Sequence, residues 1–123
     1  TRKIFHDDNL KITTTTVRIP VMRSHCESVL IETKKRVTPD EVRELLSKAP
    51  GVKVFDDPSN NIYPTPIATQ GQDIIYVGRI RQDTSSETGI WLWACGDQIR
   101  KGAATNTIQI GEVLIQRGLL DKK

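Results

Sequence analysis

The sequence has few cysteines and few aromatic residues, and each shortage excludes a class of protein. Two cysteines among 123 residues, Cys26 and Cys95, make neither a disulfide framework nor a metal-ligand cluster. An aromatic content of 5% argues against a nucleic-acid binder that stacks bases on aromatic side chains. No apolar run approaches the roughly 20 residues that cross a membrane, and no signal peptide opens the chain. We therefore expect a cytoplasmic protein with reduced thiols and no metal, membrane or nucleic-acid partner.

Basic residues are present in modest excess, with a net charge of +3. The densest basic run, residues 34–36, stands just before a turn and is typical of a solvated loop, so a nucleic-acid patch is the weaker interpretation. Basic side chains are better read here as ligands for small anionic substrates. Residues 1–5 are amphipathic and helix-like without a start signal, so we expect a piece of a longer protein.

Periodicity and turn residues predict an α+β fold. Residues 11–19 are rich in β-branched side chains and favour a strand, which Pro20 interrupts before a second strand over 21–35. Thr38, Pro39 and Glu41 are typical of a capped helix start. The predicted strands are 11–19, 21–35, 52–55, 73–83 and 90–95, and the predicted helices are 38–49 and a long one from 97. This order favours a mixed, largely antiparallel sheet with helices on one face.

The segment 17–29 concentrates side chains that suit an anion and a proton. His25 can donate or accept a proton near neutral pH. Arg23 lies two residues earlier, so on a strand both would face the same way. Arg18 would reach the same pocket only if the chain bends at Pro20. A planar guanidinium pairs well with carboxylate or phosphate, although these arginines could also form ordinary ion pairs with Glu27, Glu32 or Asp residues elsewhere.

Two further features concern the cysteines and the segment 96–106. Cys26 follows His25 directly, and neighbours on a strand face opposite ways, so the thiol should point away from the imidazole. Cys95 reads as a small buried residue. Asp97 can cap the last helix, which places Gln98 in its first turn, where a side-chain amide could recognise another amide. A tightly packed helix without a ligand is the alternative. No GxGxxG or P-loop motif occurs.

Together, four motifs resemble the C-terminal half of the aspartate-semialdehyde dehydrogenase family. They are VRIPVMRSHCESV, NNIYPTP, VGRIRQD and GDQIRKGAATN, in this order, and the resemblance covers essentially the whole chain. The related reductase that acts on N-acetylglutamyl phosphate shares a KGA helix. It lacks an arginine seven residues ahead of the histidine, so it ranks second.

The resemblance implies a reaction and roles for three residues. The family reduces aspartyl phosphate to aspartate semialdehyde with NADPH, through a cysteine thioester, in lysine, threonine and methionine synthesis. By position, Arg18 resembles the residue that binds the substrate α-carboxylate, and His25 the general acid–base. Gln98 resembles the residue that holds the nicotinamide carboxamide, and Arg23 would have a supporting role.

The resemblance also implies what this chain does not carry. The nucleophilic cysteine and the glycine-rich dinucleotide loop belong to the other half of the family's chain, so the isolated chain is expected to be inactive. Residues 1–96 would form a catalytic and dimerisation domain similar to the C-terminal domain of glyceraldehyde-3-phosphate dehydrogenase. Residues 97–123 would form a helix against the dinucleotide-binding domain. The expected partner is a second copy bound through the sheet, as a dimer or a tetramer. A non-catalytic interaction module remains the alternative.

Overall fold

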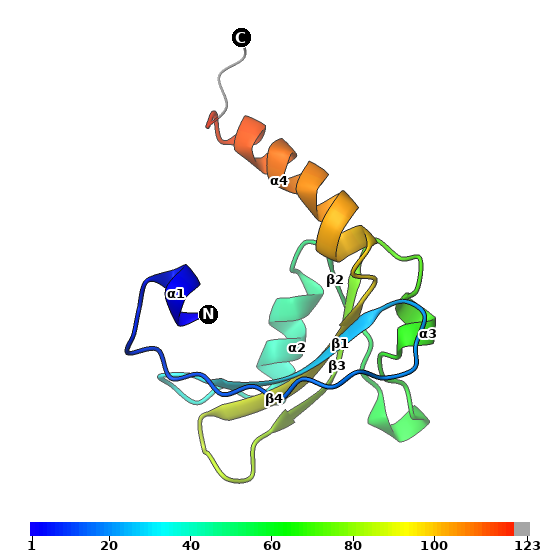
Figure 1. The fold of residues 1–123 in the computed structure, drawn as a ribbon. Helices are drawn as coiled ribbons and strands as arrows, with labels where there is room; N and C mark the ends of the chain where they lie inside the picture. Colours follow the sequence, from blue (N-terminus) through cyan, green and yellow to red (C-terminus); the bar gives the residue numbers. More distant parts are fainter. Residues whose placement is uncertain (120–123) are drawn as a thin grey trace.

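The computed structural model describes residues 1–119 as a four-stranded sheet with helices around it (Figure 1). The strands are β1 (His25–Glu32), β2 (Val52–Val54), β3 (Ile75–Gln82) and β4 (Gly89–Gly96), in the order β1-β4-β3-β2. The helices are α1 (Arg2–Phe5), α2 (Pro39–Ser47), α3 (Pro66–Thr69) and α4 (Thr105–Gln116), with short helical turns η1 (Pro58–Asn60) and η2 (Arg100–Ala104). Strands β1, β4 and β3 run antiparallel, while β2 runs parallel to β3. The predicted α+β class is confirmed.

Helix α2 begins where its sequence predicts. The Thr38 backbone N–H donates to the Glu41 carboxylate at 2.7 Å, and the Glu41 N–H donates to the Thr38 hydroxyl at 3.3 Å. This reciprocal pair satisfies donors that the first turn of a helix otherwise leaves free. Pro39 occupies the first helical position, where its missing N–H costs nothing.

The hydrophobic core lies between α2 and one face of the sheet. Val77, Ile80 and Ile90 are its most buried members. Val42 and Leu46 of α2 pack against them, because the apolar positions of α2 recur at helical spacing on one side. This packing determines which face of each strand is turned inward.

The polar connection after β2 is anchored by the buried carboxylate of Asp56. That carboxylate accepts hydrogen bonds from the backbone N–H of Arg79 at 2.5 Å and from the side chain of Arg43 at 2.9 Å. Arg79 has a positive φ of 52°, and the register of β3 against β4 shifts between Gly78 and Arg81. Asp56 therefore stabilises a β-bulge by binding the N–H that the ladder leaves unpaired.

The predicted strand over residues 11–19 is wrong. The structure places this stretch in an extended segment without strand pairing, and residues 11–18 donate no backbone hydrogen bond to another described segment. β-branched residues favour extended backbone, but a strand also needs a neighbour to pair with. The second predicted strand is shortened to His25–Glu32, because Ser24 adopts a left-handed conformation with φ 78°.

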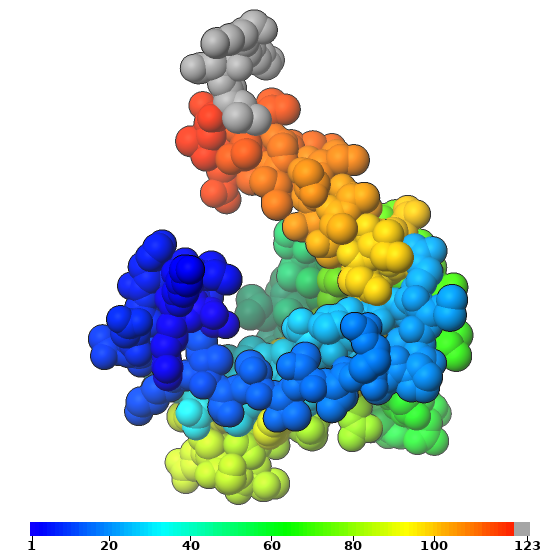
Figure 2. All heavy atoms as spheres, in the orientation of Figure 1, coloured from blue at the N-terminus to red at the C-terminus, as the bar shows by residue number. Residues whose placement is uncertain are grey.

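The last helix starts later than predicted. Asp97 is followed by the wide turn η2, and regular α-helix begins at Thr105. Figures 1 and 2 show α4 extending away from the sheet. Its apolar side chains Ile108, Ile110 and Ile115 are all more than half exposed. The predicted segment 97–123 ends in residues 120–123, which lie outside the described part of the chain.

Candidate active site

His25 is the first residue of β1 and has one acidic neighbour. Its Nε2 lies 3.2 Å from Glu27 Oε1, and both side chains are largely exposed. The two residues are separated by one position on a strand, so they share a face. Glu27 was not predicted as a partner of His25. The spacing of two on a predicted strand was the signal that could have identified it.

The predicted residues His25 and Gln98 line the same cavity. In the register of β1 with β4, His25 lies opposite Gly96, and Gln98 follows Gly96 by two positions. The cavity has a volume of about 260 Å³, and its walls come from β1, β4, the start of β3 and the turn that leads to α4. Gly102 completes its lining. Two segments from opposite ends of the sequence are thus brought together.

Gly96 lets the end of the Ile75 side chain lie close to the strand at this cavity. A Cβ at Gly96 would lie 2.2 Å from Cδ1 of Ile75 and would force that side chain to move. Gln98 is exposed, and its amide group has no hydrogen-bond partner among residues 1–119. A free amide and an imidazole therefore face the same space, which suits binding of a carboxamide beside a proton-transfer site.

Arg18 lies outside this cavity. It belongs to the segment without strand pairing, it is exposed, and it is absent from the cavity lining. The predicted bend at Pro20 is present as a bend in the backbone. The conformation of residues 11–24 does not bring Arg18 to His25, so its role in carboxylate binding stays a prediction.

The position of Arg23 also differs from the prediction that it lies on the same strand face as His25. It precedes the strand, and the left-handed backbone of Ser24 separates it from His25. Its Nη2 forms an ion pair with Oδ2 of the fully buried Asp97 at 2.7 Å. The expectation failed because the period of two applies only within a continuous strand.

The two cysteines occupy facing positions on β1 and β4. Cys26 pairs with Cys95 in the strand register with a Cα–Cα distance of 4.4 Å, and the structure joins them as a disulfide. This corrects the expectation of reduced thiols: opposite positions of an antiparallel pair are close enough for a bridge, whatever their sequence separation. The prediction that Cys26 points away from His25 agrees with the register, in which odd and even positions alternate.

The turn before β3 is tied to η2 by a surface ion pair. Asp73 accepts hydrogen bonds from the guanidinium of Arg100 and from the hydroxyl of Thr105. The bonds from Arg100 and Thr105 lower the pKa of Asp73 from 3.8 to about 2. Asp73 therefore helps to fix the helical turn that follows Gln98.

Replacing Asp73 by asparagine should remove stability at neutral pH and remove none well below pH 2. Because the folded-state pKa of Asp73 is lowered, its stabilisation is complete above the unfolded value of 3.8 and disappears as the pH falls through about 2. Urea unfolding of the chain and of Asp73→Asn at a series of pH values measures this difference. An equal gap in unfolding free energy at both ends of the series would contradict it.

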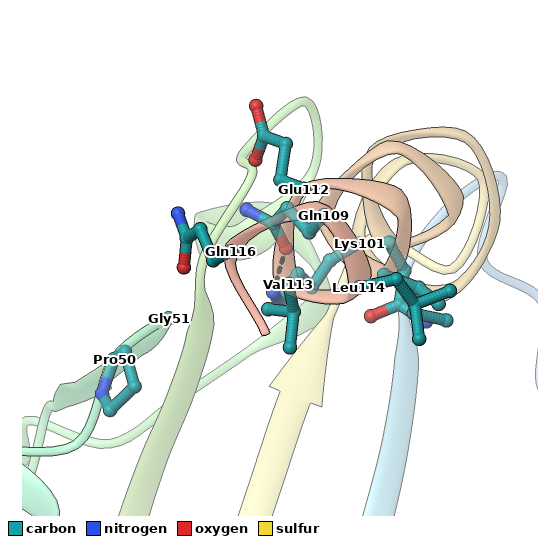
Figure 3. A pocket seen from close by; sticks show the side chains of 10 residues that line it. Pro50, Gly51, Lys101, Gln109, Glu112, Val113, Leu114 and Gln116 are labelled. Carbon is teal, nitrogen blue, oxygen red and sulfur yellow. Dashed lines mark hydrogen bonds between the residues drawn. The ribbon is translucent and has the colours of Figure 1, made fainter. Parts of the chain in front are cut away.

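A second cavity of about 410 Å³ lies between α4 and the turn after α2. Figure 3 shows Lys101 and Gln109 pointing toward one another within it, with Pro50 and Gly51 on the opposite wall. The Lys101 ammonium group donates a hydrogen bond to the Gln109 side chain. None of the predicted site residues lines this cavity.

Residues 1–119 contain neither a metal-binding cluster nor a membrane-spanning helix. Within residues 1–119 no group of three or more His, Cys, Asp or Glu side chains is placed to hold a metal ion. In the same part of the chain, no helix has both the length and the apolar character needed to cross a bilayer. The cavity with His25 and Gln98 is therefore the candidate active site.

Comparisons with known proteins agree on one family. A family model described as the semialdehyde dehydrogenase dimerisation domain matches residues 1–101. Aspartate-semialdehyde dehydrogenase from Aquifex aeolicus is 53% identical over 120 residues, which are 98% of this chain and 35% of that protein. The enzyme of the same name from Legionella pneumophila is 51% identical over 121 residues, with 98% and 35% covered.

Solved structures give the same result. Aspartate semialdehyde dehydrogenase II from Vibrio cholerae, solved as a complex with ASA, superposes with a TM-score of 0.82 at 38% sequence identity. The alignment covers 94% of this chain and 34% of that one. A probable aspartate-semialdehyde dehydrogenase from Pseudomonas aeruginosa superposes with a TM-score of 0.70 at 33% identity, with 78% and 28% covered. The chain thus spans about a third of the length of the relatives it matches.

Proposed function

The chain belongs to the aspartate-semialdehyde dehydrogenase family, and from that premise we propose that it supplies the acid–base and dimerisation part of this oxidoreductase. The reaction would be the NADPH-dependent reduction of aspartyl phosphate to aspartate semialdehyde and phosphate, a step toward lysine, threonine and methionine. The observation that supports this proposal best is the cavity shared by His25 and Gln98.

His25 would transfer the protons of the reaction. A cysteine outside this chain would attack the acyl carbon of aspartyl phosphate, forming a C–S bond as the C–O bond to phosphate breaks. His25 would accept the thiol proton as the thioester forms. After hydride has added to the thioester carbon, the tetrahedral oxyanion would collapse to aldehyde as the C–S bond breaks, and His25 would return the proton to the thiolate. Neither Cys26 nor Cys95 suits the role of nucleophile, because the two sulfurs are joined in a disulfide and neither is a free thiol.

Gln98 would hold the carboxamide of the nicotinamide, and Arg18 the α-carboxylate of the substrate. The cavity of about 260 Å³ falls below the roughly 300–1,000 Å³ of complete small-molecule pockets, so it suits one ring of a dinucleotide and not the whole. The free amide group of Gln98 fits this use, since it can both donate to and accept from a carboxamide. When bound, the cofactor would supply the hydride. Arg18 would need residues 11–24 to close toward His25 when substrate binds.

The matched dimerisation model supports a homodimer. The face of the sheet opposite α2 carries Trp91 and Trp93, which are half-buried in the single chain. We propose that this face pairs with a second copy. Large apolar aromatic side chains are typical of the centres of such interfaces.

The proposed reaction can be tested in a chimera. In the Aquifex aeolicus enzyme, the third that matches this chain is replaced by residues 1–123; we call the product the Aquifex chimera. It should oxidise aspartate semialdehyde in a reaction that requires both phosphate and NADP⁺, measured by the absorbance of reduced nicotinamide. Turnover of N-acetylglutamate semialdehyde in its place would favour the related reductase. A folded dimer that turns over neither substrate would contradict the enzymatic proposal and favour an interaction module.

A further inference from the structure

We propose that Arg23 and Asp97 are positioning residues, whose ion pair sets the distance between His25 and Gln98 across the cavity. The inference deepens the proposed function and rests on it, because the two side chains need a fixed separation only if they serve one reaction. Arg23 is absent from the lining of the cavity, and the oxygens of Asp97 are already occupied by hydrogen bonds, so both would act through His25 and Gln98.

Asp97 is the centre of this arrangement. Its side chain is fully buried. Oδ2 accepts from Arg23 Nη2 at 2.7 Å and from Gly71 N at 2.8 Å. Oδ1 accepts from the backbone N–H of Ile99 at 3.0 Å and of Arg100 at 3.4 Å. Burial works to raise the pKa of Asp97, but these hydrogen bonds and the Arg23 charge outweigh it and lower the pKa. The buried group is thus an anion that joins three segments of the chain.

Arg23 is held mainly by this one contact. No other carboxylate within residues 1–119 forms an ion pair with it, and its buried Nε has no hydrogen-bond partner there. The next residue, Ser24, is buried with φ 78°, and its hydroxyl accepts a hydrogen bond from Thr69 at 3.0 Å. Ser24 orients the backbone locally, whereas Arg23 connects it to the far wall of the cavity.

The positions of these residues in the chain make the ion pair a link across the site. Arg23 precedes His25 by two residues, and Asp97 precedes Gln98 directly. Beyond the first ladder pair, His25 with Gly96, the backbone on the Arg23 side is not part of the sheet. The ladder pair and the Cys26–Cys95 bridge hold the start of β1 against the end of β4. Without the ion pair, the turn beyond Gly96 that carries Gln98 could therefore shift relative to His25. A misplacement of about 1 Å can cost a reaction about 10²-fold.

Kinetics of the Aquifex chimera test the link. Arg23→Gln and Asp97→Asn should each lower kcat roughly 10–100-fold. The double variant should be no worse than the poorer single variant, because both remove the same link. Arg23→Lys, which keeps the charge, should recover part of the loss.

The primary isotope effect separates misalignment from a loss of folded protein. Measured with deuterated NADPH in the reductive direction, the isotope effect of the variants should rise, since misalignment slows hydride transfer. A smaller folded fraction would leave the isotope effect unchanged. Arg36→Gln, at an exposed arginine, is the matched control.

Additive losses in the double variant, or an unchanged isotope effect, would overturn the proposal. A second measurement does not depend on turnover. Amide hydrogen exchange over residues 97–104 of the chimera should be faster in Arg23→Gln than in Arg36→Gln, and equal exchange would also overturn the link. If the unsubstituted chimera has no activity, the proposed function fails, and this exchange comparison still decides whether Arg23 holds the start of η2.

Discussion

Replacement of His25 by alanine should lower kcat of the Aquifex chimera roughly 10²–10⁴-fold, the range that a positioned general acid–base contributes. The reason is chemical: His25 supplies the imidazole of the cavity lining, and the two carboxylates there already have partners, Glu27 on His25 and Asp97 on Arg23. Substrate binding should change little, because the imidazole would act mainly on the thiol and the collapsing oxyanion. Steady-state rates at saturating substrate measure the loss directly.

The other histidine of the chain is the matched control. His6 follows α1 in an exposed left-handed turn, far along the sequence from the cavity, and it does not line it. His6→Ala should leave kcat within about twofold, in line with the small effects of surface substitutions. If His25→Ala retained full activity, the proton-transfer role of His25 would be wrong. The fold and the family would be unaffected.

Replacement of Ile90 by alanine should destabilise the folded chain by about 2–5 kcal/mol. Ile90 is 2% exposed and lies with Val77 and Ile80 in the core beneath α2. Removing its outer carbons deletes apolar burial and leaves a cavity that a close-packed core fills only in part. The expected loss is a large fraction of the roughly 5–15 kcal/mol that stabilises a typical domain.

Urea unfolding, followed by the fluorescence of Trp91 and Trp93, measures this loss. Ile67, on α3, is 88% exposed and offers the same chemical change at the surface. Ile67→Ala should alter the free energy of unfolding by no more than about 0.5 kcal/mol. Similar losses for both variants would contradict the assignment of the core to the α2 face of the sheet.

The sequence correctly predicted those elements whose capping residues and apolar spacing lie within one continuous stretch of the chain. Helix α2 carries its cap, its first-turn proline and its apolar spacing within one stretch, so neighbouring residues alone determine it. Strand β4 is apolar throughout, which suits the inner strand that it is between β1 and β3. Residues 11–19 show the limit of such signals. Their β-branched side chains permit an extended backbone, but only a partner strand would make it part of a sheet.

The sequence identified individual residues of the candidate site, but it predicted only in part which of them lie close together. His25 and Gln98 were identified separately, through motifs at the two ends of the chain, and the sheet brings them together. Asp97 caps the turn after β4 as its position predicted, whereas its ion pair with Arg23 and the Cys26–Cys95 disulfide depended on register and burial. Arg23 was expected on the same strand face as His25, but one left-handed residue, Ser24, interrupts the alternation. Its pairing with Asp97 agrees with the alternative of an ion pair with an aspartate elsewhere.

The amino-acid sequence by itself determined the class of fold, the helix caps, the family and the chemical groups available for catalysis, because each is encoded by residue type and short spacing. The tertiary structure alone decided which groups meet. Pairing of β1 with β4 set Cys26 against Cys95 and His25 against Gly96, and the buried carboxylate of Asp97 accepts from two distant segments, at Arg23 and Gly71. Which residues come into contact depends on strand register and on the requirement that buried polar groups be hydrogen-bonded. No local sequence pattern specifies either.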